Sequence, residues 1–156
     1  MLGPLVNPVM PKYQLLGVYN LKLLRLYDYI AREQGVNCTV VHSLDGYDEI
    51  SLTSPFKVAS ADGERLMDAS MLGLSAVSQS DLYGGESVEE ASAIFDRVLA
   101  GKGTAAQADC VIANAAFALK TLEPQMSLDD AIATARTSLE SGRALEAFRR
   151  FVTINS

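Results

Sequence analysis

The chain has 156 residues, 49% hydrophobic and 21% charged, which is ordinary usage for one globular domain with its own core. The net charge of −6 and the scattered Lys and Arg residues argue against non-specific binding to nucleic acid. No apolar run approaches the roughly 18–20 residues that span a bilayer, and the start lacks the basic and apolar segments of a signal peptide. We therefore expect a cytoplasmic protein that makes no contact with a membrane.

The first third of the chain predicts a strand, a helix and a second strand. The segment Tyr13–Tyr19 is short, aromatic and β-branched, as strands often are. Asn20 is a plausible N-cap for a helix with apolar residues at helical spacing, and Gly35 is placed to end that helix. Cys38–His42 then has the unbroken apolar character of a buried strand. This order indicates a βαβ unit with parallel pairing, and therefore an α/β fold.

A loop over residues 43–54 follows the second predicted strand. Ligands in open α/β sheets gather beyond the carboxyl ends of strands, so this loop is where a site is expected. After it, Phe56–Ser60 and Arg65–Asp68 flank Asp62 and Gly63. An Asp-Gly pair between two short runs predicts a hairpin, which adds antiparallel pairing to the sheet.

The second half of the chain predicts helices. Two capping boxes, in which a Ser or Thr is followed three residues later by Glu or Gln, begin helices at Ser87 and Thr104. Ser127 opens a third helix, whose acidic first turn suits the positive end of the helix dipole. Gly142 separates that helix from a last one, which runs through about Phe151.

The loop after the second strand carries three carboxylates within five residues, on Asp45, Asp48 and Glu49. Hard cations prefer oxygen ligands, and Mg²⁺ is usually held by one or two carboxylates together with substrate phosphates. Adjacent residues on a strand point to opposite faces, so Asp48 and Glu49 can converge only in a loop or at a helix start. Spacing alone favours a solvated acidic turn and leaves a Mg²⁺ site as the alternative.

Other polar groups have structural interpretations. Gly84 and Gly85 precede a helix, where backbone N–H groups can hold phosphate, but acids already occupy that end and favour a tight turn. His42 is the only histidine and is predicted to be a satisfied core or rim residue instead of a catalytic base. Ser43, Ser51 and Ser54 lack a nearby His–acid arrangement, which argues against a nucleophilic serine. Cys38 and Cys110 are expected to be reduced thiols in the core.

Five segments, in their order and spacing, closely resemble anthranilate phosphoribosyltransferase, and the resemblance covers essentially the whole chain. The main departure is Ser43, where the family often has glycine after the histidine, and this changes the flexibility of the loop. The resemblance implies a catalytic α/β domain of the nucleoside phosphorylase and phosphoribosyltransferase type. That fold would have a partial mixed, mainly parallel sheet, flanking helices and a helix-rich C-terminal half. The five segments are Leu2–Pro8, Tyr13–Tyr19, Val41–Ser51, Leu82–Gly85 and Asn114–Ala116.

The same resemblance implies that residues 1–156 are the C-terminal part of this α/β domain. In the family the Leu-Gly-Pro-Leu segment lies near the middle of a chain about twice this long, so Met1 is expected to be an internal methionine. The family's N-terminal helical domain and its glycine-rich diphosphate-binding loop have no counterpart here. We therefore expect the fragment to be inactive alone, and to expose a sheet edge and apolar surface that favour association.

For the complete enzyme, the resemblance implies transfer of a phosphoribosyl group from phosphoribosyl pyrophosphate to the amine of anthranilate, in tryptophan biosynthesis. Mg²⁺ is the expected cofactor, since it neutralises the departing diphosphate. Asp48 and Glu49 match the family's metal-binding pair, and Gly3 and Pro4 match a loop that lines the anthranilate site. This piece matches no residue that reacts with substrate, and the full-length enzyme is expected to be a homodimer.

Two alternatives stay open. The first is another enzyme on the same fold, such as a relative of pyrimidine nucleoside phosphorylase, against which the loop of Asp48 and Glu49 argues. The second is a non-catalytic paralogue that binds nucleic acid, against which the net charge of −6 argues.

Overall fold

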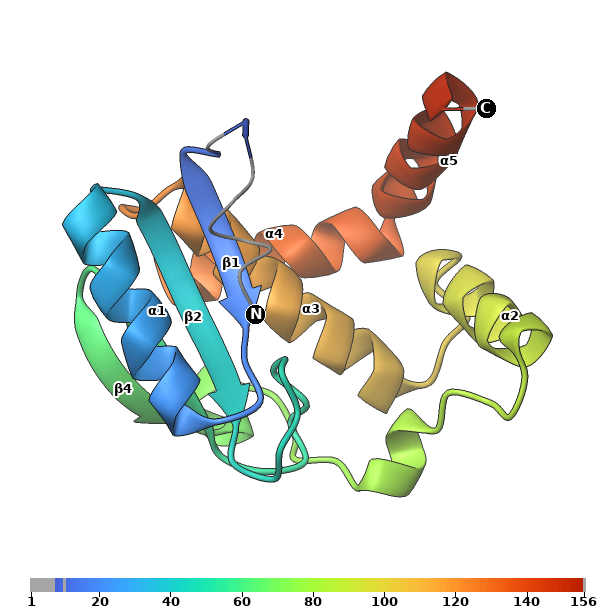
Figure 1. The fold of residues 1–156 in the computed structure, drawn as a ribbon. Coiled ribbons are helices and arrows are strands. Elements are labelled where there is room, and N and C mark those ends of the chain that lie inside the picture. Colours follow the sequence, from blue (N-terminus) through green and yellow to red (C-terminus); the bar gives the residue numbers. More distant parts are fainter. Residues whose placement is uncertain (1–7, 10, 156) are drawn as a thin grey trace.

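The computed structural model describes residues 8–9 and 11–155 and shows a four-stranded sheet with helices on both of its faces (Figure 1). The strand order is β1-β2-β3-β4, with β1 parallel to β2 and the other neighbours antiparallel. The α/β class and the mixed sheet are confirmed. The expectation of mainly parallel pairing is wrong for the described residues, because the loop after β2 and the β3–β4 hairpin each reverse the chain. The elements are β1 Tyr13–Gly17, α1 Leu21–Gln34, β2 Asn37–Ser43, β3 Phe56–Ser60, β4 Gly63–Met67, η2 Ala69–Leu72, η3 Gln79–Leu82, α2 Val88–Leu99, α3 Ala105–Leu122, α4 Leu128–Glu140 and α5 Arg143–Asn155.

The predicted βαβ unit is present, and its helix begins and ends at the predicted capping residues. The Asn20 side chain accepts a hydrogen bond from the Leu23 N–H at 2.9 Å, which caps α1. Gly35 ends the helix in the left-handed conformation, with φ of 65°. β1 is shorter than predicted, since it ends at Gly17 instead of Tyr19 before the chain turns into α1.

Strand β2 is buried on both faces, which explains its unbroken apolar sequence. Val40 packs with α1 in one hydrophobic cluster, whereas Val41 packs with α3 and α4 in a second cluster. On the α3 side, the rings of Phe56 and Phe117 meet edge to face with their centres 5.9 Å apart. The two layers hold β2 between them, and this fixes the position of the loop that leaves its carboxyl end.

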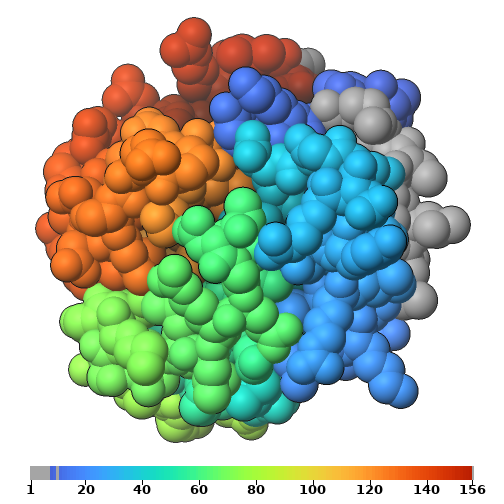
Figure 2. Space-filling view, turned by 90° about the vertical axis from the view of Figure 1, so that its left-hand side faces the viewer, coloured from blue at the N-terminus to red at the C-terminus, as the bar shows by residue number. Residues whose placement is uncertain are grey.

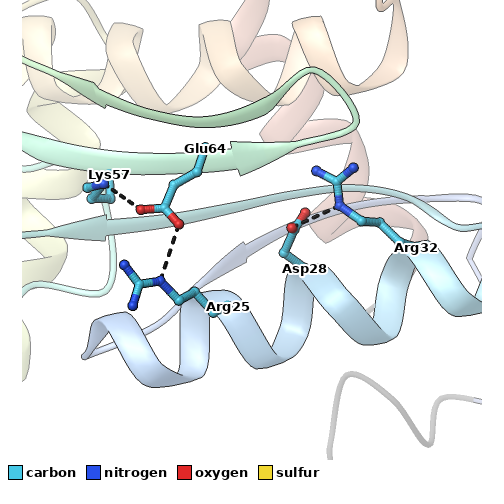
Figure 3. A network of polar contacts seen from close by, with 5 residues as sticks. All are labelled: Arg25, Asp28, Arg32, Lys57 and Glu64. Carbon is cyan, nitrogen blue, oxygen red and sulfur yellow. Dashed lines mark hydrogen bonds and ion pairs between the residues drawn. The ribbon is translucent and has the colours of Figure 1, made fainter.

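Five charged side chains, the outer network, link α1 to the β3–β4 hairpin (Figure 3). The Glu64 carboxylate accepts hydrogen bonds from Lys57 on β3 and from Arg25 on α1, the latter at 3.4 Å. The Asp28 carboxylate accepts a hydrogen bond from Arg32 at 2.9 Å within α1. Both carboxylates of the outer network therefore have cationic partners, and the network ties the edge strand β4 to the helix.

The predicted hairpin turns through Ala61 and Asp62, and Gly63 opens β4 with φ of 107°. Glycine tolerates this backbone conformation with little strain, so the Asp-Gly signal is explained by Gly63 at the first position of the returning strand. Figure 2 shows the β3–β4 hairpin (green) between α1 (blue) and α4 (orange).

The N-caps predicted at Ser87, Thr104 and Ser127 all begin helices. Thr104 forms the complete capping box. The box predicted at Ser87 is only half formed, because the Glu90 carboxylate accepts a hydrogen bond from the Glu86 N–H at 2.7 Å instead. The short 3-10 helices η2 and η3 were not predicted. Within the described part of the chain, no helix has both the length and the apolar character needed to cross a bilayer.

The last helix, α5, projects from the body of the domain (Figure 1). It contacts α2 through Phe148 and Phe95, whose ring centres lie 4.9 Å apart. Farther along α5, Phe151 and Ile154 are 63% and 71% exposed. Among the described residues, β1 pairs only with β2 and so has an open side. The uncovered apolar surface and sheet edge agree with expectation, and their tendency to associate stays a prediction.

Candidate functional site

The loop between β2 and β3, residues 44–55, lies beyond the carboxyl ends of the parallel strands β1 and β2 (Figure 1). We call it the acid loop. Its base is closed by a hydrogen bond of 2.9 Å from the Leu44 N–H to the Pro55 carbonyl. The loop therefore stands at the edge of the sheet where the sequence predicted a site.

Asp45 belongs to the framework of this loop. Its carboxylate accepts hydrogen bonds from the hydroxyls of Thr53 at 2.5 Å and Ser54 at 2.8 Å. Partial burial acts to raise the pKa of Asp45, but these hydrogen bonds, with smaller contributions from the Asp45 backbone and Gln79, outweigh burial and lower it. Of the three carboxylates grouped by the sequence, Asp45 is thus occupied in holding the two ends of the loop together.

Asp48 and Glu49 occupy the exposed crest of the acid loop. Neither carboxylate has a hydrogen bond or an ion pair to any residue that the structure describes. The backbone beneath them is tightly seated, because Gly17 at the end of β1 packs directly against the Asp48 peptide. A Cβ atom on Gly17 would lie only 1.5 Å from the Asp48 carbonyl oxygen. The absence of a side chain at position 17 therefore makes room for the acid pair.

The sequence analysis did not single out Gly17 as a site residue. A glycine at the end of a strand often marks a close approach by another backbone, and this is the signal that was available. The segment Tyr13–Tyr19 contains it, but nothing in the segment indicates which part of the chain approaches.

A strained residue lies just after the acid pair. Leu52 has φ of 61°, the only positive φ outside glycine among the described residues. This region of backbone space costs a residue with a side chain about 1–2 kcal/mol, so the conformation persists only when its surroundings fix it. Leu52 is 1% exposed in the core, and its carbonyl accepts a hydrogen bond from the Val77 N–H at 3.1 Å. Such strain is concentrated at functional loops more often than elsewhere.

The carboxylate oxygens of the acid pair are suitable ligands for a hard cation, but two carboxylates are too few to complete its coordination. Over residues 8–9 and 11–155, no group of three or more His, Cys, Asp or Glu side chains is arranged to hold a metal ion. Two carboxylates with open space around them match the way in which Mg²⁺ is held by a few protein oxygens, with the rest from water and substrate phosphates. The residues present therefore fit a Mg²⁺ ion shared with a phosphorylated ligand.

His42 has the structural role predicted for it. It is 5% exposed, and its Nδ1 lies 2.8 Å from the carbonyl oxygen of Val18. A carbonyl oxygen only accepts, so Nδ1 carries the proton and donates. The ring thus ties the end of β1 to β2 and is not placed as a catalytic base.

The glycine turn before α2 also has the structural role predicted for it. Gly85 has φ of 89°, and a Cβ on it would lie 2.6 Å from the Cβ of Glu90. The Glu90 carboxylate already lies at this helix end, where it accepts a hydrogen bond from the Glu86 N–H. An anion would meet a carboxylate here, so no phosphate site is assigned to the turn.

Both cysteines are free thiols, as expected. Burial, with a smaller contribution from Asp28, raises the pKa of Cys38 to about 11. Burial, with a smaller contribution from Glu49, raises the pKa of Cys110 to about 11. Cys110 is only half-buried and hydrogen bonds the Ile50 carbonyl at 3.2 Å, so it lies beside the acid loop instead of deep in the core.

The substrate-site residues expected at Gly3 and Pro4 lie outside the described residues. Their assignment therefore stays a prediction.

Comparison with known proteins shows which family the chain is similar to. Residues 1–145 match the sequence profile described as glycosyl transferase family, a/b domain. An anthranilate phosphoribosyltransferase of Bacteroides fragilis is 54% identical over 155 residues, which cover 99% of this chain and 47% of the relative. The enzyme of that name from Bacteroides thetaiotaomicron is 51% identical over 156 residues, with 100% and 47% covered. The chain thus spans about half the length of the curated relatives that it matches.

Solved structures give the same match in three dimensions. The anthranilate phosphoribosyltransferase of Thermus thermophilus superposes with a TM-score of 0.88 at 30% identity, over 97% of this chain and 46% of that one. The Saccharomyces cerevisiae enzyme in complex with PRPP and Mg has a TM-score of 0.85 at 26% identity, with 97% and 44% covered.

Proposed function

The chain belongs to the glycosyl transferase family, and on that premise we propose that it is the metal-binding C-terminal half of an anthranilate phosphoribosyltransferase. The observation that carries the proposal is 54% identity, across 99% of the chain, to a relative of that name. The exposed acid pair at the carboxyl edge of the sheet supports it independently. The full-length protein would transfer the phosphoribosyl group of phosphoribosyl pyrophosphate to the anthranilate amine.

In this proposal Asp48 and Glu49 bind Mg²⁺ through their carboxylate oxygens. A bound Mg²⁺ supplies positive charge that stabilises the diphosphate as it leaves. The acid loop contributes a fixed backbone with two carboxylates that no described residue neutralises, and it leaves open coordination positions for diphosphate oxygens and water. The pair supplies few ligands by itself, so the chain alone is expected to bind Mg²⁺ weakly. Tight Mg²⁺ binding by the isolated chain in calorimetric titration would contradict this.

Gly3 and Pro4 are proposed to line the anthranilate site of the whole enzyme. The homodimer expected from the resemblance and the cytoplasmic location expected from the sequence stay predictions.

A hybrid protein tests the proposal. The N-terminal half of the Bacteroides fragilis relative is joined ahead of residues 1–156, and phosphoribosylation of anthranilate is followed by the loss of anthranilate fluorescence. We expect transfer that requires Mg²⁺ and falls at least about 100-fold in Asp48→Asn and Glu49→Gln variants. A folded hybrid that instead cleaves pyrimidine nucleosides with phosphate would favour the alternative enzyme of the same fold.

The chain of 156 residues, assayed alone with both substrates and Mg²⁺, should give no product. Its relatives are about twice as long, so groups that bind the diphosphate and anthranilate are expected in the part that this chain does not match. Product formation by the purified chain alone would show that these groups are dispensable.

A further inference from the structure

The peptide groups on the C-terminal side of the acid pair are held from two directions. From β2, the Ser43 hydroxyl donates a hydrogen bond of 2.6 Å to the Glu49 carbonyl. From α3, the Asn114 Oδ1 accepts from the Ile50 N–H at 3.0 Å, and its Nδ2 donates to the Ile50 carbonyl at 2.8 Å. The Asn114 carboxamide thus binds both polar backbone groups of one residue, as a neighbouring strand would.

The carboxamide chemistry at position 114 is specific. The second proton on Nδ2 is donated to the Cys110 carbonyl one turn earlier in α3, at 2.9 Å. Both amide protons and the amide oxygen are therefore in use. An aspartate would place an acceptor against two carbonyl oxygens. A leucine of similar size would leave the Ile50 N–H without its partner and the Ile50 carbonyl with only the Cys110 thiol.

Ser43 completes the frame from the sheet side. Its side chain is fully buried, and its Oγ also accepts a hydrogen bond from the Ser51 N–H at 3.2 Å. One hydroxyl therefore bridges the backbone on both sides of Ile50, which is itself completely buried. The loop is thus held by hydrogen bonds along its backbone, and its two carboxylates are exposed.

These hydrogen bonds oppose the tendency of the two carboxylates to move apart. Two like charges on adjacent residues repel each other, and a mobile loop would relieve the repulsion by turning the side chains apart. A fixed Ile50 peptide limits that relaxation. The carboxylates are then held ready for a cation before it arrives, which lowers the ordering cost of binding.

We propose that Asn114 and Ser43 are positioning residues for the metal-binding pair, and that they act through the backbone of Glu49 and Ile50. The inference rests on the proposed function, because Asp48 and Glu49 are the metal ligands there. It assigns to α3 a role in metal binding, although α3 itself supplies no ligand.

The first test measures the loop without metal or substrate. Amide hydrogen exchange is followed by mass spectrometry in the 156-residue chain, comparing Asn114→Leu and Ser43→Ala with the parent. The matched control is Thr121→Val, since Thr121 also hydrogen bonds from α3 to the sheet, to Thr39 at 2.8 Å, but at the other end. Exchange over residues 44–55 should be at least tenfold faster in the first two variants and unchanged in the control.

The second test measures the metal in the hybrid protein. The Mg²⁺ concentration that gives half the maximal rate should rise about 10–100-fold in both variants. The rate at saturating Mg²⁺ should stay within about threefold of the parent, because no group that touches substrate has changed. The Thr121→Val control should leave both quantities unchanged. Ser43→Ala retains the test if Asn114→Leu does not fold.

The outcomes separate the two proposals. Faster exchange with an unchanged Mg²⁺ requirement overturns the positioning role, while the proposed function stands. A folded parent hybrid without Mg²⁺-dependent transfer overturns the proposed function and the metal role of Asn114 with it. Equal exchange in Asn114→Leu, Ser43→Ala and the control overturns the inference regardless of activity.

Discussion

The acid loop and the outer network both contain carboxylates, but they treat negative charge in opposite ways. In the outer network, Asp28 and Glu64 are each paired with a cation from the same chain. In the acid loop, the framework is built from hydroxyls, an amide and one carboxylate bound to hydroxyls, and the charges of Asp48 and Glu49 have no cationic partner among the described residues. Charge that is already neutralised serves structure, and charge that is left open is available to an external cation.

The choice of uncharged framework groups has a physical consequence. A lysine or arginine beside Asp48 and Glu49 would hold them as firmly as Arg25 and Lys57 hold Glu64. It would also compete with Mg²⁺ for the same oxygens. Asn114 and Ser43 fix the backbone without offering a positive charge, so they leave the acid pair available.

The largest expected effect is a difference in transfer activity between variants of the acid pair and a variant of the outer network. In the hybrid protein, Asp48→Asn or Glu49→Gln should lower transfer at least about 100-fold with little change in the melting temperature. Glu64→Gln is the matched control, and its activity at room temperature should stay within about twofold of the parent, because Glu64 hydrogen bonds Lys57 and Arg25 and not the acid pair. Equal loss of activity in all three variants would remove the distinction between the two regions.

The next effect concerns the space left by Gly17. Gly17→Ala should displace the acid loop, because the added Cβ would overlap the Asp48 carbonyl. We expect a loss of about 1–3 kcal/mol in the free energy of unfolding, measured by urea denaturation of the isolated chain. Gly84→Ala is the control, since a Cβ there meets no atom within 4 Å and should have little effect.

A smaller effect sharpens the description of the outer network. The hydrogen bond from Lys57 is the largest effect on the pKa of Glu64 and lowers it; burial opposes this, and the weaker interactions with Arg25 lower the pKa further. A carboxyl group whose pKa is lowered by folding stabilises the fold at any pH above its ordinary pKa. This stabilisation is lost as the pH falls below about 4. Glu64→Gln should cost about 0.5–1 kcal/mol at neutral pH, since exposed pairs are screened by solvent. Denaturation of parent and variant at about pH 3 should show a smaller difference.

The smallest effect uses the two thiols as reporters of the two regions. With pKa values of about 11, Cys38 and Cys110 should react slowly with iodoacetamide at about pH 8. Asp28→Asn should speed alkylation of Cys38 alone, and Glu49→Gln should speed that of Cys110 alone, each by less than about tenfold. Peptide mass spectrometry resolves the two sites. Crossed effects would mean that the variants disturb the fold instead of the local charge.

The fold and the site were not equally predictable from the sequence. Caps such as Asn20 and Thr104, and the turn at Gly63, depend on residues within a few positions, so their signals are local. The acid pair was found by the spacing of its carboxylates, and it was predicted to bind metal only through the resemblance of its flanking segments. Gly17 could not be assigned, because the strand that contains it does not reveal that the Asp48 backbone approaches.

Asn114 shows the same limit more clearly. It was one of the residues that carried the resemblance, but spacing gave it no role. Its partner Ile50 lies 64 positions earlier, and only the packing of α3 against the sheet brings the two together. Asp45 shows the converse, since a nearby acid that looked like a third ligand is bound to Thr53 and Ser54.

The separation between Ile50 and Asn114 also sets an order of events during synthesis. Helix α1 and the β3–β4 hairpin involve contacts close in sequence and can form as soon as they leave the ribosome. The acid loop cannot take its final shape until α3 has been made and has docked. At the usual pace of translation this delay is on the order of 3–13 s. The two acids are therefore made before the helix that fixes their loop, and they become a binding site only after α3 has docked.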